Sequence, residues 1–544
     1  MKKISVLMLV LFFPFFMTAL WAGNPSGEPA ADWLPPGDEE YFAINLGGSI
    51  SAQLNHEILD GQDEYSAFYD SELIGLDYRT RLFQLLIEGS MRADEKYSEQ
   101  EPYFGGRYIF LNDAYVRADL DRFSFKAGQG PQKDIVDSPY SLFISSKDNP
   151  VLHGEFTYAG DFFFYKTRWV SMNSNSALTY YGVDGAAAPS GSWPDGSGST
   201  LDSTLWLDKG MNFKVYGFQK GDWKFGLEDV VVYLGRSFDP GYFLNPLPQY
   251  FLQLITSDTK VPWEQAGNSK SMLGFFAVLD RDSWGGDAQI LIDDINLDFL
   301  PFVPERSFKT KMAWNIGGWK DTAIGRFGFH HAGATKYTFQ STRTIESGSS
   351  WGTPGYVSVP YSILPYEYTY FPVNQYESDS GTMPIESEDL YAGYKYGENN
   401  LAFLIDYENE LFKNSPFEFK LYSSFEYVLN GSKSPSNPWH EYDSPRNPDI
   451  ESSSILLFTG APIEHILRVK TTARKKLGDF TLMADLLFGY VFNGSKLVDV
   501  TPNYEDYSGA DVTWDEPKIY VPQNGNNYPL FQMTLGLNYS LRLN

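Results

Sequence analysis

The fourteen residues FQMTLGLNYSLRLN, from Phe531 to Asn544, alternate strictly in character. Every second residue from Phe531 to Leu543 is apolar, and glutamine, threonine, glycine, asparagine, serine and arginine lie between them. A period of two over this length predicts a β-strand with one apolar face and one polar face. Strands of soluble proteins usually run to about 5–6 residues. The segment therefore favours a strand that crosses a membrane.

The same alternation recurs along the chain. It is clearest over 42–54, 308–316, 417–429 and 480–492, where charged residues fall on the second face. Shorter stretches of the same kind lie at 74–87, 114–120, 162–170, 205–217, 223–235, 272–280, 284–296, 390–396 and 401–407. Repeated strands of this type are typical of a transmembrane antiparallel β-barrel, with lipid outside and water or polar side chains inside.

The connections between these strands fall into two length classes. Short turns rich in glycine, asparagine and aspartate are expected at Leu120–Arg122, Gly160–Asp161, Gly221–Asp222, Arg281–Ser283, Gly397–Asn400 and Gly478–Asp479. Long loops are expected at about 173–203, 236–270, 340–387, 430–462 and 493–527. Short periplasmic turns and long extracellular loops characterise outer-membrane barrels, and roughly 25–30 residues per strand predict about 16–18 strands. Within 57–107, the sequence does not show which connection between strands lies on the extracellular side.

The first 40 residues look like a targeting segment and a leader into the barrel. Lys2 and Lys3 precede an apolar run from Ile4 to Trp21, which predicts a secretory signal peptide over 1–22. Residues 23–40 are expected to form a flexible periplasmic lead-in, and 41–544 the barrel. No other segment approaches the roughly 20 apolar residues of a membrane helix. The expected location is the bacterial outer membrane, reached through its assembly machinery.

Composition supports a lipid environment and excludes some partners. Aromatic residues make up 17% of the chain, an excess that girdles at the two membrane interfaces would explain. The formal net charge of −27 argues against a nucleic-acid partner. The chain has no cysteine, which excludes disulfides and thiolate metal sites.

Charged residues on the predicted inward faces are the first candidate site. These candidate lumen charges are Asp77, Arg79, Arg81, Asp113, Arg117, Asp119, Lys126, Lys309 and Lys311. Arginines that face acids across a lumen select small solutes by charge and size. The alternative, which we favour by about two to one, is that the charges pair with neighbours and brace the wall.

Aromatic residues in the predicted loops are the second candidate site. They are Trp193, Trp263, Trp351, Tyr366, Tyr368, Trp439 and Trp514. Flat aromatic faces beside carboxylates and amides suit sugar rings. Taken one by one, most of these residues are better explained by interface girdles or by packing between loops. A cluster of them is the stronger candidate for glycan contact.

The sequence does not favour an enzyme. None of the motifs GxSxG, HExxH or a P-loop is present, and no catalytic residue or cofactor is predicted. Adjacent His330 and His331 point to opposite faces of a strand and cannot share a metal from there. Asp293, Asp294 and Asp298 suit calcium, but a solvated or arginine-paired strand end is the favoured interpretation.

Two segments resemble a known family. LNDAYVRADLDRFSFKAGQG (111–130) and DSPYSLFISSKDNPVLHGEFTYAG (137–160) resemble the early strands of the capsule-assembly (Wzi-type) outer-membrane barrels. LNPL (244–247) and AQILIDDINLD (288–298) are similar to later family features, whereas 129–132 departs from the family's Trp-Gly-Pro type sequence. The resemblance implies an 18-stranded barrel and attachment of surface polysaccharide.

Three functions follow as hypotheses. The leading one is a non-enzymatic outer-membrane barrel that takes part in assembling or attaching surface polysaccharide through its extracellular loops. The alternative is a general diffusion porin for small hydrophilic solutes, and a loop-borne adhesin is the third. The first two differ in whether the lumen is plugged or open.

Overall fold

The computed structural model describes most of the chain from residue 40 onward. The described residues are 40–57, 65–93, 107–145, 147–173, 209–234, 236–256, 269–294, 310–340, 368–370, 375–378, 381–385, 387–412, 418–433, 457–458, 462–478, 480–498 and 519–543. The predicted signal peptide and almost all of the predicted lead-in lie outside them.

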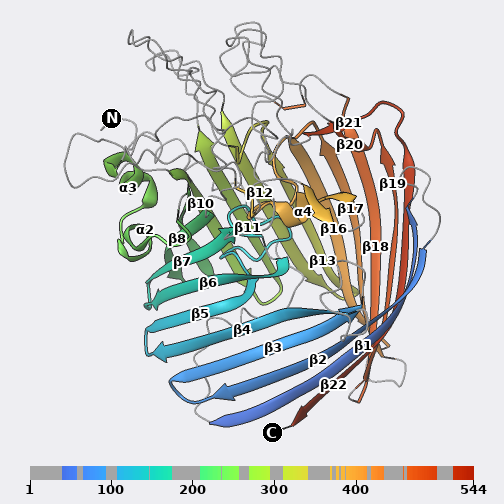
Figure 1. The fold of residues 1–544 in the computed structure, drawn as a ribbon, viewed down its shortest axis with the longest axis horizontal. Coiled ribbons are helices and arrows are strands. Elements are labelled where there is room, and N and C mark those ends of the chain that lie inside the picture. Colours follow the sequence, from blue (N-terminus) through green and yellow to red (C-terminus); the bar gives the residue numbers. More distant parts are fainter. Residues whose placement is uncertain are drawn as a thin grey trace, which may run out of the picture.

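Eighteen antiparallel strands form one closed barrel (Figure 1). The strands are β1 (Tyr41–Glu57), β2 (Tyr65–Arg79), β3 (Phe83–Ala93), β4 (Tyr108–Leu120), β5 (Phe123–Gln132), β6 (Lys147–Ala159), β7 (Phe163–Asn173), β8 (Lys209–Lys220), β9 (Trp223–Leu234), β10 (Ser269–Arg281), β11 (Trp284–Asp294), β12 (Lys311–Thr322), β13 (Gly325–Ala334), β16 (Asn400–Leu411), β17 (Phe419–Asn430), β18 (Glu464–Leu477), β19 (Phe480–Phe492) and β22 (Tyr528–Leu543). Each pairs with the next, and β22 closes the ring on β1 with Ala52 opposite Leu535. The predicted fold class is confirmed.

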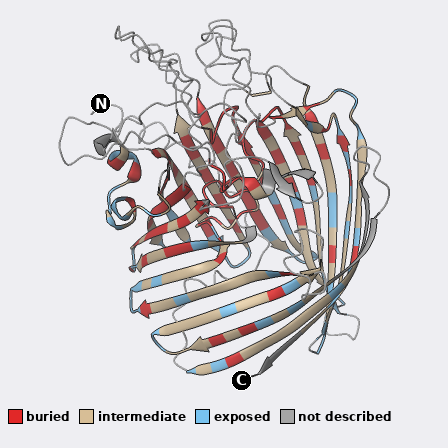
Figure 2. Ribbon diagram, viewed as in Figure 1, coloured by how far each residue is buried: buried red, intermediate tan, exposed pale blue. Residues whose placement is uncertain are grey.

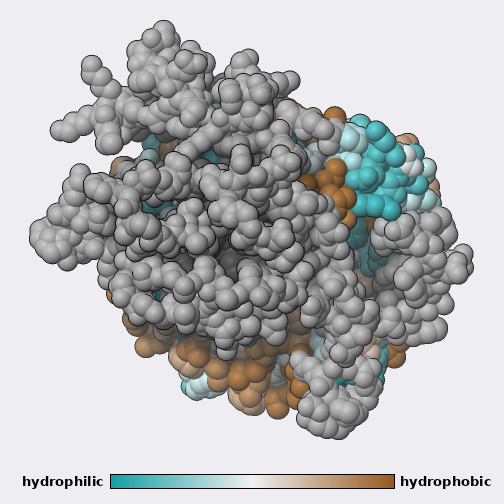
Figure 3. Space-filling view, turned by 45° about the horizontal axis from the view of Figure 1, so that its top comes forward, coloured by the Kyte–Doolittle hydropathy of each residue, from teal (hydrophilic) through white to brown (hydrophobic). Residues whose placement is uncertain are grey.

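The outer face of the wall is apolar, as the alternation predicted. Ile50, Ile74 and Phe488 are 65%, 66% and 61% exposed, and they point outward between strand neighbours that face the lumen. A hydrophobic belt is visible along the outer wall in Figure 3. Rings cluster near the short turns, as in Phe163–Phe218, and near the opposite rim, as in Tyr490–Phe492. This is the outer surface of a barrel that sits in lipid.

The turn between β2 and β3 corrects the prediction of a single strand over 74–87. The chain reverses at Thr80–Leu82, where Thr80 N–H donates to Phe83 O at 2.7 Å and Phe83 N–H donates to Thr80 Oγ1 at 3.1 Å. A threonine hydroxyl stabilises this turn instead of a glycine or asparagine, so it lacks the usual sequence signal. Arg81 lies exposed in this turn and not on a strand.

A second correction concerns 390–396 and the expected hairpin turn at Gly397–Asn400. These residues do not form a barrel strand and its turn, because the wall passes directly from β13 to β16. Residues 390–399 belong to the long connection between those strands and enter the barrel interior, whereas Asn400 begins β16. That connection also contains β14 (Gln375–Ser378), β15 (Gly381–Pro384) and α4 (Ser387–Leu390).

The remaining elements lie in two other long connections. α2 (Pro240–Leu244) and α3 (Gln249–Thr256) follow β9 and lie on the outside of the barrel (Figure 1). β20 (Ser495–Val498) and β21 (Ile519–Pro522) pair with each other between β19 and β22. No helix in the described part of the chain has the length and apolar character needed to cross a membrane.

Burial is uneven around the barrel. Buried residues concentrate on the strands from β6 to β13 and on chain inside the barrel, whereas β1–β4 are mostly of intermediate exposure (Figure 2). The hydrophobic core contains residues of β7–β13 together with Tyr140, Phe143, Tyr368 and Tyr394, which come from loops. The loops, and not the wall alone, therefore build the core of this protein.

Candidate functional site

Two inward-folded loops divide the lumen, and we call them the partition. It consists of 133–145, between β5 and β6, and of the described parts of the β13–β16 connection at 335–340, 368–370 and 387–399. Its largest side chains, among them Tyr140, Phe143 and Tyr394, are fully buried. An internal loop packed this completely is a fixed part of the fold.

The first loop folds inward because its own polar groups are satisfied locally. Asp134 Oδ2 accepts hydrogen bonds from the backbone of Phe143 and Ile144 at 3.2 and 3.1 Å. Ser141 Oγ donates to Val136 O at 2.7 Å and to Ser138 O at 2.8 Å. Serine and aspartate side chains replace the partners that a strand or helix would supply. The four apolar or aromatic residues of YSLFI are thus free to pack in the lumen.

The partition crosses the barrel between distant strands. Tyr140 Oη donates to Glu426 Oε1 on β17 at 2.8 Å, and Leu142 N–H donates to Gln289 Oε1 on β11 at 3.0 Å. The loop leaves the wall at β5, so these bonds connect nearly opposite sides of the eighteen-stranded ring. Burial raises the pKa of Tyr140 well above its ordinary value, and nearby Glu426 adds to the effect. The phenol therefore stays protonated and keeps donating.

The two loops also bind each other. Ser145 N–H donates to Ala392 O at 2.9 Å, and Tyr394 N–H donates to Leu142 O at 3.2 Å. The Tyr140 and Tyr394 rings meet edge to face, with centroids 6.1 Å apart. Backbone bonds and aromatic packing together make one continuous body out of segments that are far apart in the chain.

Close approach of the two loops requires a glycine at position 393. A Cβ there would lie 2.1 Å from Leu142 O. We expect Gly393→Ala to push the loops apart and to produce frequent transient openings in single-channel recordings. Gly154→Ala is the matched control, because a Cβ at 154 meets only Trp169 Cε3, at 3.5 Å. Identical current traces for wild type and Gly393→Ala would show that the contact is not needed to hold the partition.

Buried charges on the wall surround the partition. Glu155 on β6 lies 3.2 Å from Lys166 Nζ and 2.6 Å from Arg168 Nη2 on β7. Arg168 Nη1 also donates to Lys133 O at the root of the first loop, at 2.7 Å. On β17, Glu426 contacts Lys395 Nζ at 3.2 Å. Charged groups buried in this way hold the loops only while each has its partner.

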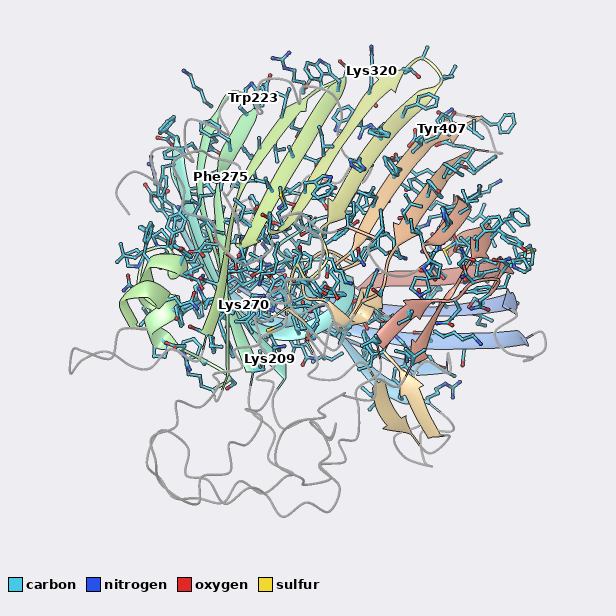
Figure 4. All side chains as sticks on the ribbon, turned by 90° about the horizontal axis from the view of Figure 1, so that it is seen from above. Lys209, Trp223, Lys270, Phe275, Lys320 and Tyr407 are labelled. Carbon is cyan, nitrogen blue, oxygen red and sulfur yellow. The ribbon has the colours of Figure 1, made fainter. Side chains whose placement is uncertain are left out.

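Further contacts come from lysines on β8 and β10. Lys209 Nζ donates to Thr369 Oγ1 at 3.2 Å, and Lys270 Nζ donates to Gln340 O. In Figure 4 both lysines lie beside the dense interior cluster, whereas Trp223, Lys320 and Tyr407 lie along the short-turn rim. The partition is therefore bonded to β8, β10, β11 and β17.

The candidate lumen charges are spread over several places. Asp77 accepts from Tyr41 Oη at 2.7 Å and from Gln84 Nε2 at 3.1 Å, and Arg117 Nε pairs with Asp119 Oδ2 at 2.9 Å. Lys126 Nζ lies 4.0 Å above the Tyr115 ring. These contacts are those expected of bracing groups.

The other candidate charges lie apart from this group. Lys311 pairs with Asp293 Oδ2 at 3.7 Å, near the partition. Asp113 contacts β5, where a Cβ at Gly130 would lie 2.3 Å from its Oδ1, and Arg79 ends β2. Arg81 is in the short turn, and Lys309 lies outside the described residues.

The candidate glycan-contacting aromatics are mostly untested by the structure. Trp193, Trp263, Trp351, Tyr366, Trp439 and Trp514 lie outside the described residues. Tyr368 is fully buried in the partition, and its Oη donates to Phe143 O. Its ring offers no exposed face to a ligand.

Two other sequence interpretations can be placed. His330 points inward and lies 3.2 Å from Asp406 Oδ2, while His331 points outward and receives the Trp314 indole N–H at 3.1 Å. The two rings do lie on opposite faces. Asp293 is held by Lys270 at 2.8 Å as well as by Lys311, so it forms a buried strand end paired with lysines, whereas the sequence favoured a solvated or arginine-paired one. Asp298 lies outside the described residues.

Part of the inner wall is more polar and less buried, although Arg468 Nη1 on β18 still donates to Tyr396 Oη of the partition at 3.4 Å. On β1, Asn45, Ser49 and Ser51 face the lumen with intermediate exposure, and on β18 Lys470 and Arg474 are exposed on the same inner side. We call the inner faces of β1–β4, β18, β19 and β22 the polar half-lumen. Hydroxyl, amide and basic groups there suit water and hydrophilic solutes.

A closed antiparallel barrel with an apolar outside, short turns at one rim and long connections at the other is a bacterial outer-membrane β-barrel. No family model and no curated protein matches the chain. Among solved structures it is similar to Wzi of Escherichia coli, described as an outer-membrane, carbohydrate-binding β-barrel involved in group 1 capsule assembly. That match has 10% identity, covers 91% of this chain and 83% of Wzi, and has a TM-score of 0.45.

Two other solved structures are similar to about the same degree. OprD of Pseudomonas aeruginosa is 7% identical, with 94% of this chain and 95% of OprD covered and a TM-score of 0.45. OccAB4 of Acinetobacter baumannii is 8% identical, with 93% and 100% covered and a TM-score of 0.43.

Proposed function

We propose that this protein is a non-enzymatic outer-membrane barrel that holds surface polysaccharide at its extracellular side. The observation that supports this proposal is the partition. A body of buried tyrosines and phenylalanines, bonded to strands on opposite sides of the wall, removes the wide bore that a general diffusion pore needs. A barrel closed in this way acts through its external loops, where the sequence places tryptophans and carboxylates.

The polar half-lumen favours a second candidate, a narrow porin for small hydrophilic solutes. Lys470 and Arg474 are exposed on the inner face of β18, and acidic Glu88 lies on the inner face of β3, five strands away in the ring. A passage lined in this way would select solutes by charge and size. The two proposals differ in what loop aromatics do, since a porin does not need them to bind sugar.

Binding of the producing cell's own surface polysaccharide tests the first candidate. We expect the refolded full chain to retain this polysaccharide on a sensor surface. Replacing Trp193, Trp351 and Trp439 by alanine is expected to weaken retention at least about tenfold. The reason is that stacking on an aromatic face contributes on the order of 1 kcal/mol per ring. The matched control replaces Trp223 and Trp284, which lie at the short-turn rim. Equal retention by all three proteins, or none by wild type, would contradict the proposal.

A further inference from the structure

Polar side chains occupy part of the outer wall, where the rest of the barrel is apolar. The strand register places Thr167, Lys214 and Asp229 side by side on β7, β8 and β9. They belong to the same outward-facing set as Phe218 and Phe225, whose rings contact each other beside the short turns. Lys214 and Asp229 are nevertheless completely buried. Something on the outside of the barrel must therefore cover them.

The cover is the segment 236–256, which contains α2 and α3 and which we call the outer cap. Lys214 Nζ donates to Leu247 O at 2.9 Å, and Thr167 Oγ1 donates to Phe243 O at 3.2 Å. The Gln249 backbone N–H donates to Asp229 Oδ2. Each of these three side chains thus has a hydrogen-bond partner in the cap, as burial in an apolar medium requires.

The outer cap descends far along the wall. Its upper contact is Trp169 Nε1 to Ser237 O at 2.5 Å, and its lower contact is Tyr216 Oη to Pro246 O at 2.9 Å. Tyr216 is only one outward position above Phe218 and its ring cluster near the short turns. The cap thus extends from the long-loop rim across most of the height of β8.

The side of the cap that faces away from the wall is apolar. Leu244 and Leu247 are 72% and 48% exposed, and Tyr250 and Phe251 are 43% and 49% exposed. Phe238, 42% exposed, packs at right angles on Trp169 of the wall. This surface continues the lipid-facing surface of the adjoining strands, where Phe225 is 45% exposed.

We propose that the outer cap is a membrane-inserted element whose exposed face contacts lipid acyl chains in place of the wall of β7–β10. The exposed face of the cap is continuous with the apolar belt of the wall and lies at the same height as the strands. The lipid that surrounds the strands therefore also contacts the cap. The inner side of the cap supplies the hydrogen bonds that Lys214 and Asp229 would lack in lipid. The inference depends on the outer-membrane location and not on the proposed polysaccharide binding.

Site-directed labelling can test this directly, because the chain has no cysteine. Phe251→Cys and Leu244→Cys would each carry an NBD fluorophore in the refolded full chain, reconstituted in phosphatidylcholine vesicles. Phe425→Cys, on the outward face of β17, is the lipid-exposed reference, and Asp161→Cys, in a short turn, is the aqueous reference. All four positions are exposed, so folding is expected to survive and is checked by heat-modifiable gel mobility.

We expect lipids brominated on their acyl chains to quench NBD at 251 and 244 as strongly as at 425, with iodide having little effect. Quenching by iodide at the level seen for 161 would overturn the inference, because the cap would then lie in water. Protection from both quenchers would overturn it as well, since protein, such as a second copy of the chain, would then cover this face.

Discussion

Replacing residues 138–144 with a glycine-serine linker of equal length is expected to convert the barrel into a wide, steadily open channel. The segment supplies Tyr140, Leu142 and Phe143, which connect the β5 side of the lumen to β11 and β17. Without it, the second loop of the partition loses the fixed Leu142 carbonyl that accepts from Tyr394 N–H and no longer spans the lumen, and barrels of about 16–18 strands leave an aqueous channel.

The wall itself should tolerate this change. The groups that the loop leaves behind, Glu426, Gln289 and Asn315, are polar and can be hydrated in a water-filled lumen. Planar-bilayer conductance is the measurement, with heat-modifiable mobility as the check on folding. A folded linker variant with the conductance of wild type would show that 138–144 does not obstruct the lumen.

The second large effect is expected from Glu155→Gln. Glu155 is 13% exposed and lies between Lys166 and Arg168, whose side chains are 8% and 6% exposed. Removing this anion takes away the carboxylate that both buried cations contact, and breaking a buried ion pair in this way costs about 3–5 kcal/mol. Urea unfolding of the refolded barrel should show this loss in the free energy of unfolding.

Asp161→Asn provides the control for that measurement. Arg122 and Asp161 form an ion pair at 3.1 Å, but their side chains are 47% and 87% exposed. Exposed pairs contribute roughly 0–1 kcal/mol. If Glu155→Gln changed stability no more than this exposed substitution does, the buried charges would not hold the wall and the partition together.

The barrel itself could be predicted from the sequence because lipid imposes a period of two on every outward face. β1, β17, β19 and β22 follow that pattern closely, and their predicted positions agree with the structure to within a few residues. The prediction failed at 74–87, where Thr80 makes the turn, and at 390–396, where alternating tyrosines pack inside the lumen. A period of two indicates which side chains are removed from water. It does not show whether lipid or the packed interior of the barrel surrounds them.

The partition could not be predicted in the same way. Its decisive bond joins Tyr140 to Glu426, residues separated by 286 positions, and its loops meet through backbone groups that carry no residue signature. The one local signal is the run YSLFI, which is mostly apolar, does not alternate and is followed by two serines. Similarly, the outward charges at Lys214 and Asp229 broke the apolar pattern, and only the position of the outer cap explains them.

Single-channel conductance of the refolded wild-type chain tests the central claim, that the partition closes the wide bore of the barrel. The structure predicts either silence or currents far smaller than those of the linker variant, from protein shown to be folded. Small currents would support a transport role for the polar half-lumen. The absence of current would support the proposal that the protein acts by holding polysaccharide at the surface. Large, stable, step-like currents equal to those of the linker variant would contradict the account.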